Sequence, residues 1–115
     1  MRVDLTPAYV PWTATVGDSL VPVSFTLLED GVALSPSSAR AQIRAGRASA
    51  STVILALTVD LSTNTATVGD GDDLDDVDPG VYWWSLEIVS TGYPSGLTLA
   101  SGPFEVLDDG NEVIV

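Results

Sequence analysis

Apolar side chains recur at every second position in this chain, and this period constrains the fold more than any other feature of the sequence. In residues 81–89, one set of alternating positions is Tyr82, Trp84, Leu86 and Ile88, whereas the other set includes Trp83, Ser85 and Glu87. A β-strand turns successive side chains to opposite faces of its sheet. The alternation therefore predicts a strand with one face toward a core.

The rest of the chain has strand composition as well. Six further segments are expected to be strands: 9–16, 21–28, 39–45, 51–59, 65–68 and 97–106. Turn sequences separate them, among them Asp30-Gly31 and residues 60–64, and no segment has a helical stripe. About seven short strands in 115 residues predict an all-β protein with one domain over residues 1–115: an immunoglobulin-like antiparallel β-sandwich. Residues 1–9 are expected to form an N-terminal arm and residues 109–115 a C-terminal tail.

The sequence Asp78-Pro-Gly-Val-Tyr82 favours the immunoglobulin-like architecture. It is similar to a tyrosine corner, in which the Tyr hydroxyl bonds to the backbone a few residues upstream. Trp84 then stands two residues on, where antibody domains have a cysteine, so an aromatic side chain would hold the core in place of a disulfide. A plain turn followed by an aromatic strand is the alternative.

The period also predicts which side chains form the core. The expected core residues are Phe25, Leu27, Ile43, Leu55, Tyr82, Trp84, Leu86, Leu99 and Phe104. In the last segment, Leu97 and Leu99 are odd-numbered, whereas Phe104 and Val106 are even-numbered. A β-bulge at Gly102-Pro103 would reconcile the two sets; the alternative is that one strand ends there and another begins.

The composition bears on function mainly by exclusion. The chain has no cysteine, histidine or lysine, which removes disulfides, thiolate metal sites and the common nucleophile–base pairs. We therefore expect a protein that is not an enzyme, with no catalytic residues and no cofactor. A net charge of −12 repels phosphates and anionic lipids, so neither nucleic acid nor a membrane is an expected partner. Asp4 and Pro7 interrupt the apolar core that a signal peptide would need.

Two features remain as candidate sites. Six carboxylates lie within residues 70–78, and oxygen-rich loops are what calcium requires. Neither register of this stretch fits an EF-hand, so a solvated, self-repelling loop is the preferred interpretation. The weak metal-ligand candidates are Asp70, Asp72, Asp73, Asp75, Asp76 and Asp78.

The second feature is a set of candidate interface residues. Trp83 points away from the expected core, where a partner chain would cover it, or else a loop or the N-terminal arm of the same chain. The chain ends on Val113, Ile114 and Val115, an apolar segment suited to strand addition on a neighbouring subunit. Folding back as an eighth strand of its own sandwich is the alternative for this tail.

The order of these elements resembles a known family. Gly17-Asp18 precedes an alternating strand, the Asp30-Gly31 turn leads to Ala39–Arg44, and Pro79-Gly80-Val-Tyr82 and residues 97–106 follow. This layout is similar to the immunoglobulin-like N-terminal domain of tailed-phage upper baseplate proteins and to small virion proteins like it. The family's Leu-Thr-Gly after the turn reads Leu34-Ser-Pro36 here.

The resemblance implies a non-enzymatic structural component of a tailed-phage virion, in the tail, the baseplate or the head–tail region. Such a protein would be made in the host cytoplasm, reside in the virion and dock onto other virion proteins in multiple copies per particle. The alternative function is a capsid-decorating or host-surface-binding adhesion module.

Overall fold

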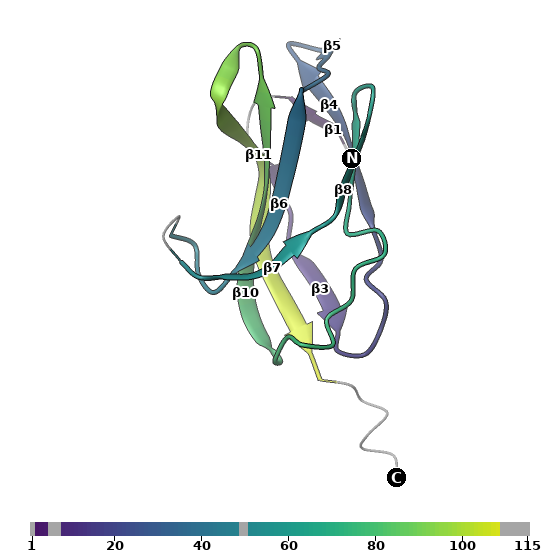
Figure 1. Ribbon diagram of the computed structural model, residues 1–115, viewed down its shortest axis with the longest axis vertical. Coiled ribbons are helices and arrows are strands. Elements are labelled where there is room, and N and C mark those ends of the chain that lie inside the picture. The colour runs from purple at the N-terminus through teal and green to yellow at the C-terminus, as the bar shows by residue number, and fades with distance from the viewer. Residues whose placement is uncertain (1, 5–7, 49–50, 109–115) are drawn as a thin grey trace.

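The computed structural model describes residues 2–4, 8–48 and 51–108 (Figure 1). Within these ranges the chain forms eleven strands and no helix, hence no helix long and apolar enough to cross a membrane. The structure therefore has four strands more than the seven expected. Two of them are the short strands β1 (Arg2–Asp4) and β5 (Val32–Ala33), and the other two arise because two of the expected strands each divide into two.

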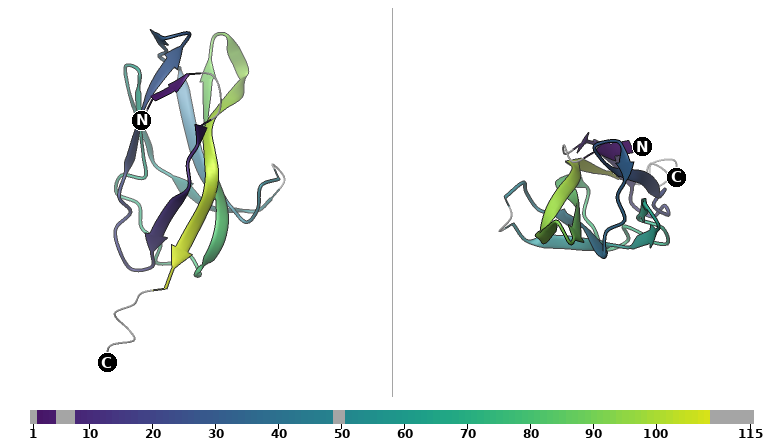
Figure 2. Two further views of the ribbon diagram at one scale, coloured as in Figure 1. Left: turned by 180° about the vertical axis from the view of Figure 1, so that it is seen from behind. Right: turned by 90° about the horizontal axis from the view of Figure 1, so that it is seen from above.

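The strands form two sheets that face each other as the layers of a sandwich (Figure 2). The first sheet has the order β1, β4 (Val23–Glu29), β9 (Thr65–Val68), β8 (Val59–Ser62), with β5 paired to β4. The second has the order β2 (Ala8–Tyr9), β11 (Tyr93–Leu107), β10 (Gly80–Ser90), β6 (Ser38–Arg44), β7 (Val53–Leu57), with β3 (Trp12–Thr15) paired to β11. In immunoglobulin lettering these are A-B-E-D and G-F-C-C′, which confirms the immunoglobulin-like sandwich.

The antiparallel pairings expected from the sequence form most of both sheets, and parallel pairings are added to them. β1 runs parallel to β4, and β2 and β3 run parallel to β11. Alternation of apolar residues identifies a strand but carries no information on the direction of its neighbour. The expected strand over 9–16 divides at Val10-Pro11, because Pro11 has no N–H to give to a ladder.

The expected buried strand over 51–59 is also two strands, and they belong to different sheets. β7 lies at an edge of the second sheet, and β8 at an edge of the first. Thr58 is the residue between them: its N–H donates to Asp72 Oδ2 (2.7 Å) and its C=O accepts from the Gly69 N–H (2.8 Å). These bonds replace ladder bonds where the chain changes sheet.

A cluster of aromatic rings occupies the centre of the core. The Trp84 ring lies 5.1 Å from that of Trp12 in an edge-to-face arrangement and 6.0 Å from that of Phe25 on the opposite sheet. Trp12 also packs against Phe104, at 5.1 Å. Seven of the nine expected core residues are 0% exposed: Phe25, Leu27, Ile43, Trp84, Leu86, Leu99 and Phe104.

The other two expected core residues are only partly buried. Leu55 lies on β7, which has a neighbour on one side only. Tyr82 lies near the end of the sandwich, and its hydroxyl donates to the Asp78 carbonyl oxygen (2.6 Å). This bond confirms the tyrosine corner.

A bulge resolves the change of parity near the C-terminus, but at another position than expected. β11 is continuous, with Leu86 opposite Ala100 and Glu87 opposite Thr98, so Leu99 is the inserted residue. Gly102 serves another purpose: a Cβ there would lie 2.3 Å from the Val10 carbonyl oxygen. That close approach lets the Trp84 Nε1–H donate to Val10 O (2.7 Å).

We expect Trp84→Ala to lower the free energy of unfolding by about 3–5 kcal/mol, because it removes a fully buried ring and leaves a cavity. Chemical denaturation followed by circular dichroism measures this change. Trp84→Phe is the matched variant: it keeps an aromatic ring but loses the bond to Val10 O, so its loss should be smaller. A cooperative Trp84→Ala variant with an unchanged midpoint would contradict the central role of this ring.

Candidate functional site

The outer face of the second sheet carries a set of polar and aromatic side chains in three cross-strand rows. Trp83 on β10 lies opposite Arg44 on β6. Ser85 lies between Gln42 and Ser101, and Glu87 pairs with Arg40. The buried residues of β10 have even numbers, so Trp83, Ser85 and Glu87 face outward. The residues paired with them on the neighbouring strands face the same side of the sheet.

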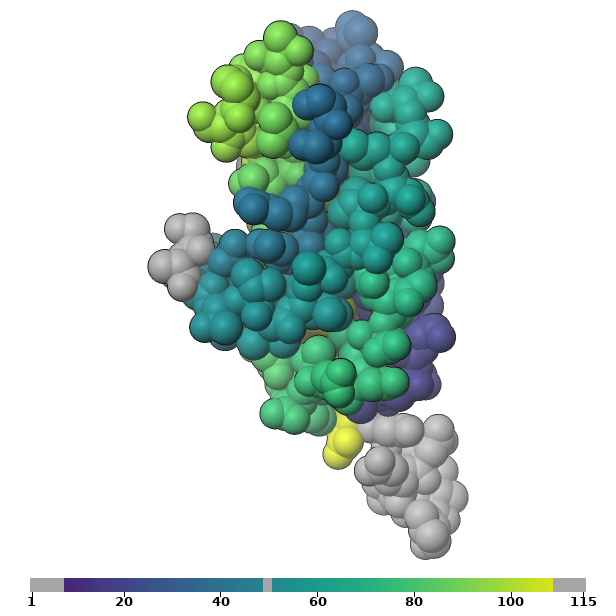
Figure 3. Space-filling model, in the orientation of Figure 1, coloured from purple at the N-terminus to yellow at the C-terminus, as the bar shows by residue number. Residues whose placement is uncertain are grey.

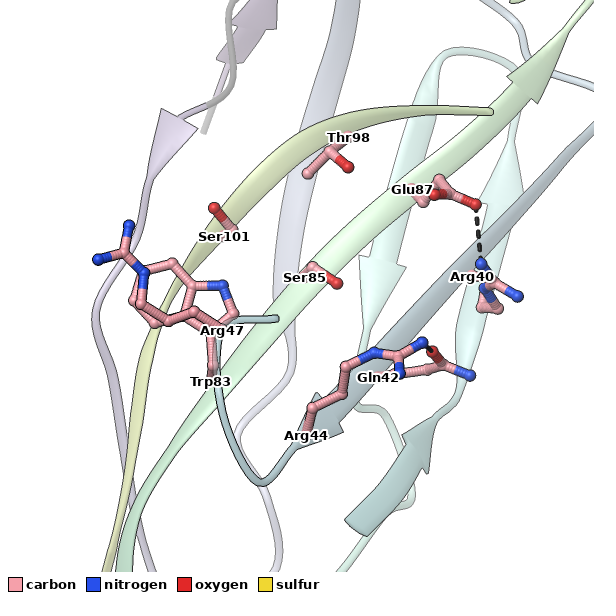
Figure 4. Close-up of a pocket in the computed structure, with 9 residues that line it drawn as sticks. All are labelled: Arg40, Gln42, Arg44, Arg47, Trp83, Ser85, Glu87, Thr98 and Ser101. Atoms are coloured by element: carbon pink, nitrogen blue, oxygen red, sulfur yellow. Dashed lines mark hydrogen bonds and ion pairs between the residues drawn. The ribbon is translucent and has the colours of Figure 1, made fainter. Parts of the chain in front are cut away.

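These side chains surround a hollow of about 290 Å³ (Figure 4). Its lining comes from β6, β10, β11 and the segment after β6, and consists of Arg40, Gln42, Arg44, Arg47, Trp83, Ser85, Glu87, Thr98 and Ser101. We call this the arginine–tryptophan face. Tyr9 extends it, because it pairs with Ser101 and is 69% exposed.

Local contacts hold the three arginines in place. The Arg47 guanidinium lies over the Trp83 ring, 4.5 Å from its centroid. Arg44 donates to the Ser51 carbonyl oxygen and to Gln42 Oε1, both at 2.8 Å. Arg40 forms an ion pair with Glu87 at 2.9 Å, and because the Arg40 side chain is exposed and that of Glu87 is partly exposed, this pair adds little stability.

The charge of this face is opposite to that of the chain. The chain has four basic residues against sixteen acidic ones, and three of the four line the hollow together with a single carboxylate, that of Glu87. A locally cationic surface on a strongly acidic molecule attracts acidic groups at short range, where screening by salt is incomplete.

The expected interface residues have different outcomes. Trp83 does face outward, but Arg47 of the same chain lies against it and leaves it half-buried. Val113, Ile114 and Val115 lie outside the described residues. The expectation about Trp83 overlooked the arginines, although the alternation of Arg40, Gln42 and Arg44 was visible in the sequence; the pairing of β6 with β10 brings the two sets together.

The acidic stretch exposes most of its carboxylates, but its apolar residues anchor it to the sandwich. Leu74 is 0% and Val77 is 6% exposed, and both belong to the core cluster. Asp72 accepts bonds from the N–H and the hydroxyl of Thr58, and Asp73 Oδ1 accepts from the Asp75 N–H (3.2 Å).

The six carboxylates of this stretch do not converge. Asp70, Asp73, Asp75, Asp76 and Asp78 are exposed, and Asp72 is partly buried. Among the residues that the structure describes, no group of three or more carboxylates could hold a metal ion. Asp72 therefore acts as a structural residue that holds the sheet crossing at Thr58.

The side chains of the arginine–tryptophan face are suited to recognition of polar or anionic groups. Ser85 and Ser101 are hydroxyl groups in a chain that has no histidine or lysine to serve as base, and Glu87 is engaged by Arg40. Guanidinium groups, an indole ring, an amide and hydroxyls are side chains that bind polar or anionic groups.

We expect Asp72→Ala to lower the free energy of unfolding by about 1–3 kcal/mol, because two bonds to Thr58 are lost. Asp76→Ala, which removes an exposed carboxylate of the same stretch, should change it by less than about 0.5 kcal/mol. Denaturant titration of both variants checks the difference, and equal effects would contradict the structural role of Asp72.

We also expect the melting temperature (Tm) to rise with monovalent salt and to respond little to micromolar calcium. Salt screens the repulsion among the exposed carboxylates, whereas calcium needs converging oxygen ligands. Differential scanning calorimetry with and without EDTA checks this expectation. An EDTA-reversible, calcium-specific rise in Tm would instead identify a metal site.

No protein-family model matches the chain, and no curated protein matches it significantly. Among solved structures, the chain is similar to Listeria monocytogenes InlP, with a TM-score of 0.45 and 18% sequence identity. The match covers 89% of this chain and 26% of the InlP chain, so the chain spans about a quarter of that protein's length.

Proposed function

We propose that this chain is a non-enzymatic structural component of a tailed-phage virion, in the tail, baseplate or head–tail region, and that it acts by docking onto other virion proteins. The order of its sequence elements, which resembles small virion proteins, supports the virion part of this proposal. The arginine–tryptophan face supports the docking part.

The observation that carries the proposal is the composition of that face. Tryptophan, tyrosine and arginine are the residues most enriched at the energetic centres of protein interfaces. Trp83, Tyr9 and three arginines gather on one side of one sheet, in a chain with only four arginines and three tryptophans. Their charge selects a partner surface that is acidic, at least where it meets the arginines.

The fixed positions of two arginine side chains also support docking. The Arg47 guanidinium lies over the Trp83 ring, and the Arg44 guanidinium is held by Gln42 and by a backbone carbonyl. Side chains that are already ordered lose less conformational entropy on binding.

An adhesion module is the second candidate function, and the floor of the hollow is the feature that favours it. Ser85, Thr98, Ser101 and Gln42 present hydroxyl and amide groups beside an indole ring. Such a set binds the hydroxyl groups of a saccharide as readily as a polar protein surface.

The test of the proposal is incorporation into phage particles. In particles assembled with the Trp83→Ala/Arg47→Ala double variant, the copy number measured by quantitative mass spectrometry should fall more than about tenfold, because both groups lie at the centre of the face. The Tm of the purified variant should change little, since both side chains lie on the outer face.

Val32→Ala is the matched control, because Val32 is 68% exposed on the other sheet, and it should be incorporated normally. Absence of the wild-type chain from purified particles would contradict the virion role. Specific binding of the wild-type chain in a glycan array, lost in the double variant, would favour the adhesion module over docking.

A further inference from the structure

The edge strand β7 carries neither the charged side chains nor the proline by which proteins often protect a sheet edge. Its sequence is Val53-Ile-Leu-Ala-Leu57, with no charge and no proline, and Val53 and Ile54 are 40% and 37% exposed. β7 pairs with β6 on one side and ends the order of its sheet. Figure 3 shows the blue-to-teal segment that contains it at the surface. An edge strand of this kind is a template for another strand.

The two outer edges of the first sheet differ from β7. β8, at one edge of the first sheet, carries Asp60, and β1, at the opposite edge, contains Arg2 and Asp4. Ile54 is the inserted residue of a bulge in the first part of β7, and Leu55, Ala56 and Leu57 keep a regular register with β6. The backbone of this second part is therefore extended and ready for pairing.

The two ends of β7 have opposite charges beside them. At its beginning, Val53 pairs with Arg44, and Arg47 lies in the segment between β6 and β7. At its end, Thr58 holds the carboxylate of Asp72 by two hydrogen bonds, and the exposed Asp60 follows on β8. An antiparallel neighbour with the same distribution would place arginines beside carboxylates at both ends.

We propose that two copies of this chain associate by antiparallel pairing of β7 with β7 about a two-fold axis, which joins their second sheets into one continuous sheet. A two-fold contact needs a self-complementary surface, and β7 meets this need in its apolar composition and in the charges beside its two ends. The proposal goes beyond the proposed function and does not rest on it.

Net charge favours an edge without acidic residues as the place where two copies meet. Each copy has a charge of −12, so approach through an acidic surface is repulsive. β6 and β7 contain no aspartate or glutamate, and β6 supplies Arg40 and Arg44.

Sedimentation velocity over a range of protein concentrations tests the proposal. The wild-type chain should show a monomer–dimer equilibrium, and Ile54→Lys should raise the dimer dissociation constant more than about tenfold, because it places a charge at the pairing edge. Val21→Lys is the matched control, since Val21 is 76% exposed and lies outside β7; it should leave the equilibrium unchanged.

A second measurement places the contact. The chain has no cysteine, so a single Ala56→Cys substitution gives one reactive thiol on the exposed side of β7. A short bifunctional maleimide should link Ala56→Cys chains into dimers, and it should not link Val32→Cys chains. A wild-type chain that stays monomeric at millimolar concentration would overturn the proposal, as would dimers that Ile54→Lys leaves intact.

Discussion

The buried indole of Trp84 is the interaction on which the rest of the structure depends. Its ring packs against Phe25 across the two sheets and against Trp12 on β3, and its N–H binds the carbonyl oxygen of Val10. In antibody domains a disulfide joins the strands that correspond to β4 and β10. Here an aromatic contact joins those strands, in a chain that has no cysteine.

The position of Trp84 also determines the outer face. Neighbouring residues of a strand point to opposite sides, so burial of Trp84 forces Trp83 outward. The same rule turns Arg40, Gln42 and Arg44 outward on β6, where Ala41 and Ile43 are buried. The arginine–tryptophan face is thus the reverse side of the core, and a shift of one residue in either strand would dismantle both.

Much of the fold and part of the candidate site were predictable from local patterns. Alternation identified the long strand β10, seven buried side chains and the outward direction of Trp83, because the period of a strand is a property of its own backbone. The tyrosine corner was predictable for the same reason, since Tyr82 and Asp78 are only four residues apart. The parity change in the last strand indicated a bulge, although Leu99 and not Gly102 turned out to be the inserted residue.

Contacts between distant segments were beyond such patterns. The acidic residues 70–78 suggested a solvated loop, yet Leu74 and Val77 enter the core and Asp72 binds Thr58, fourteen residues away. The run from Ser51 to Val59 gave no sign that its two halves belong to different sheets. Whether a strand is central or at an edge depends on its neighbours, and hydrophobic composition is the same in both cases.

The sequence by itself determined the all-β class, the inward and outward faces of the main strands and the absence of cysteine, histidine and lysine chemistry. These follow from residue type and from a period of two. Only the tertiary structure decided that Arg40, Arg44 and Arg47 meet Trp83 in one hollow, and that β7 lies at an edge. The physical reason is that strand pairing is a non-local choice, made by the packing of the whole sandwich around Trp84.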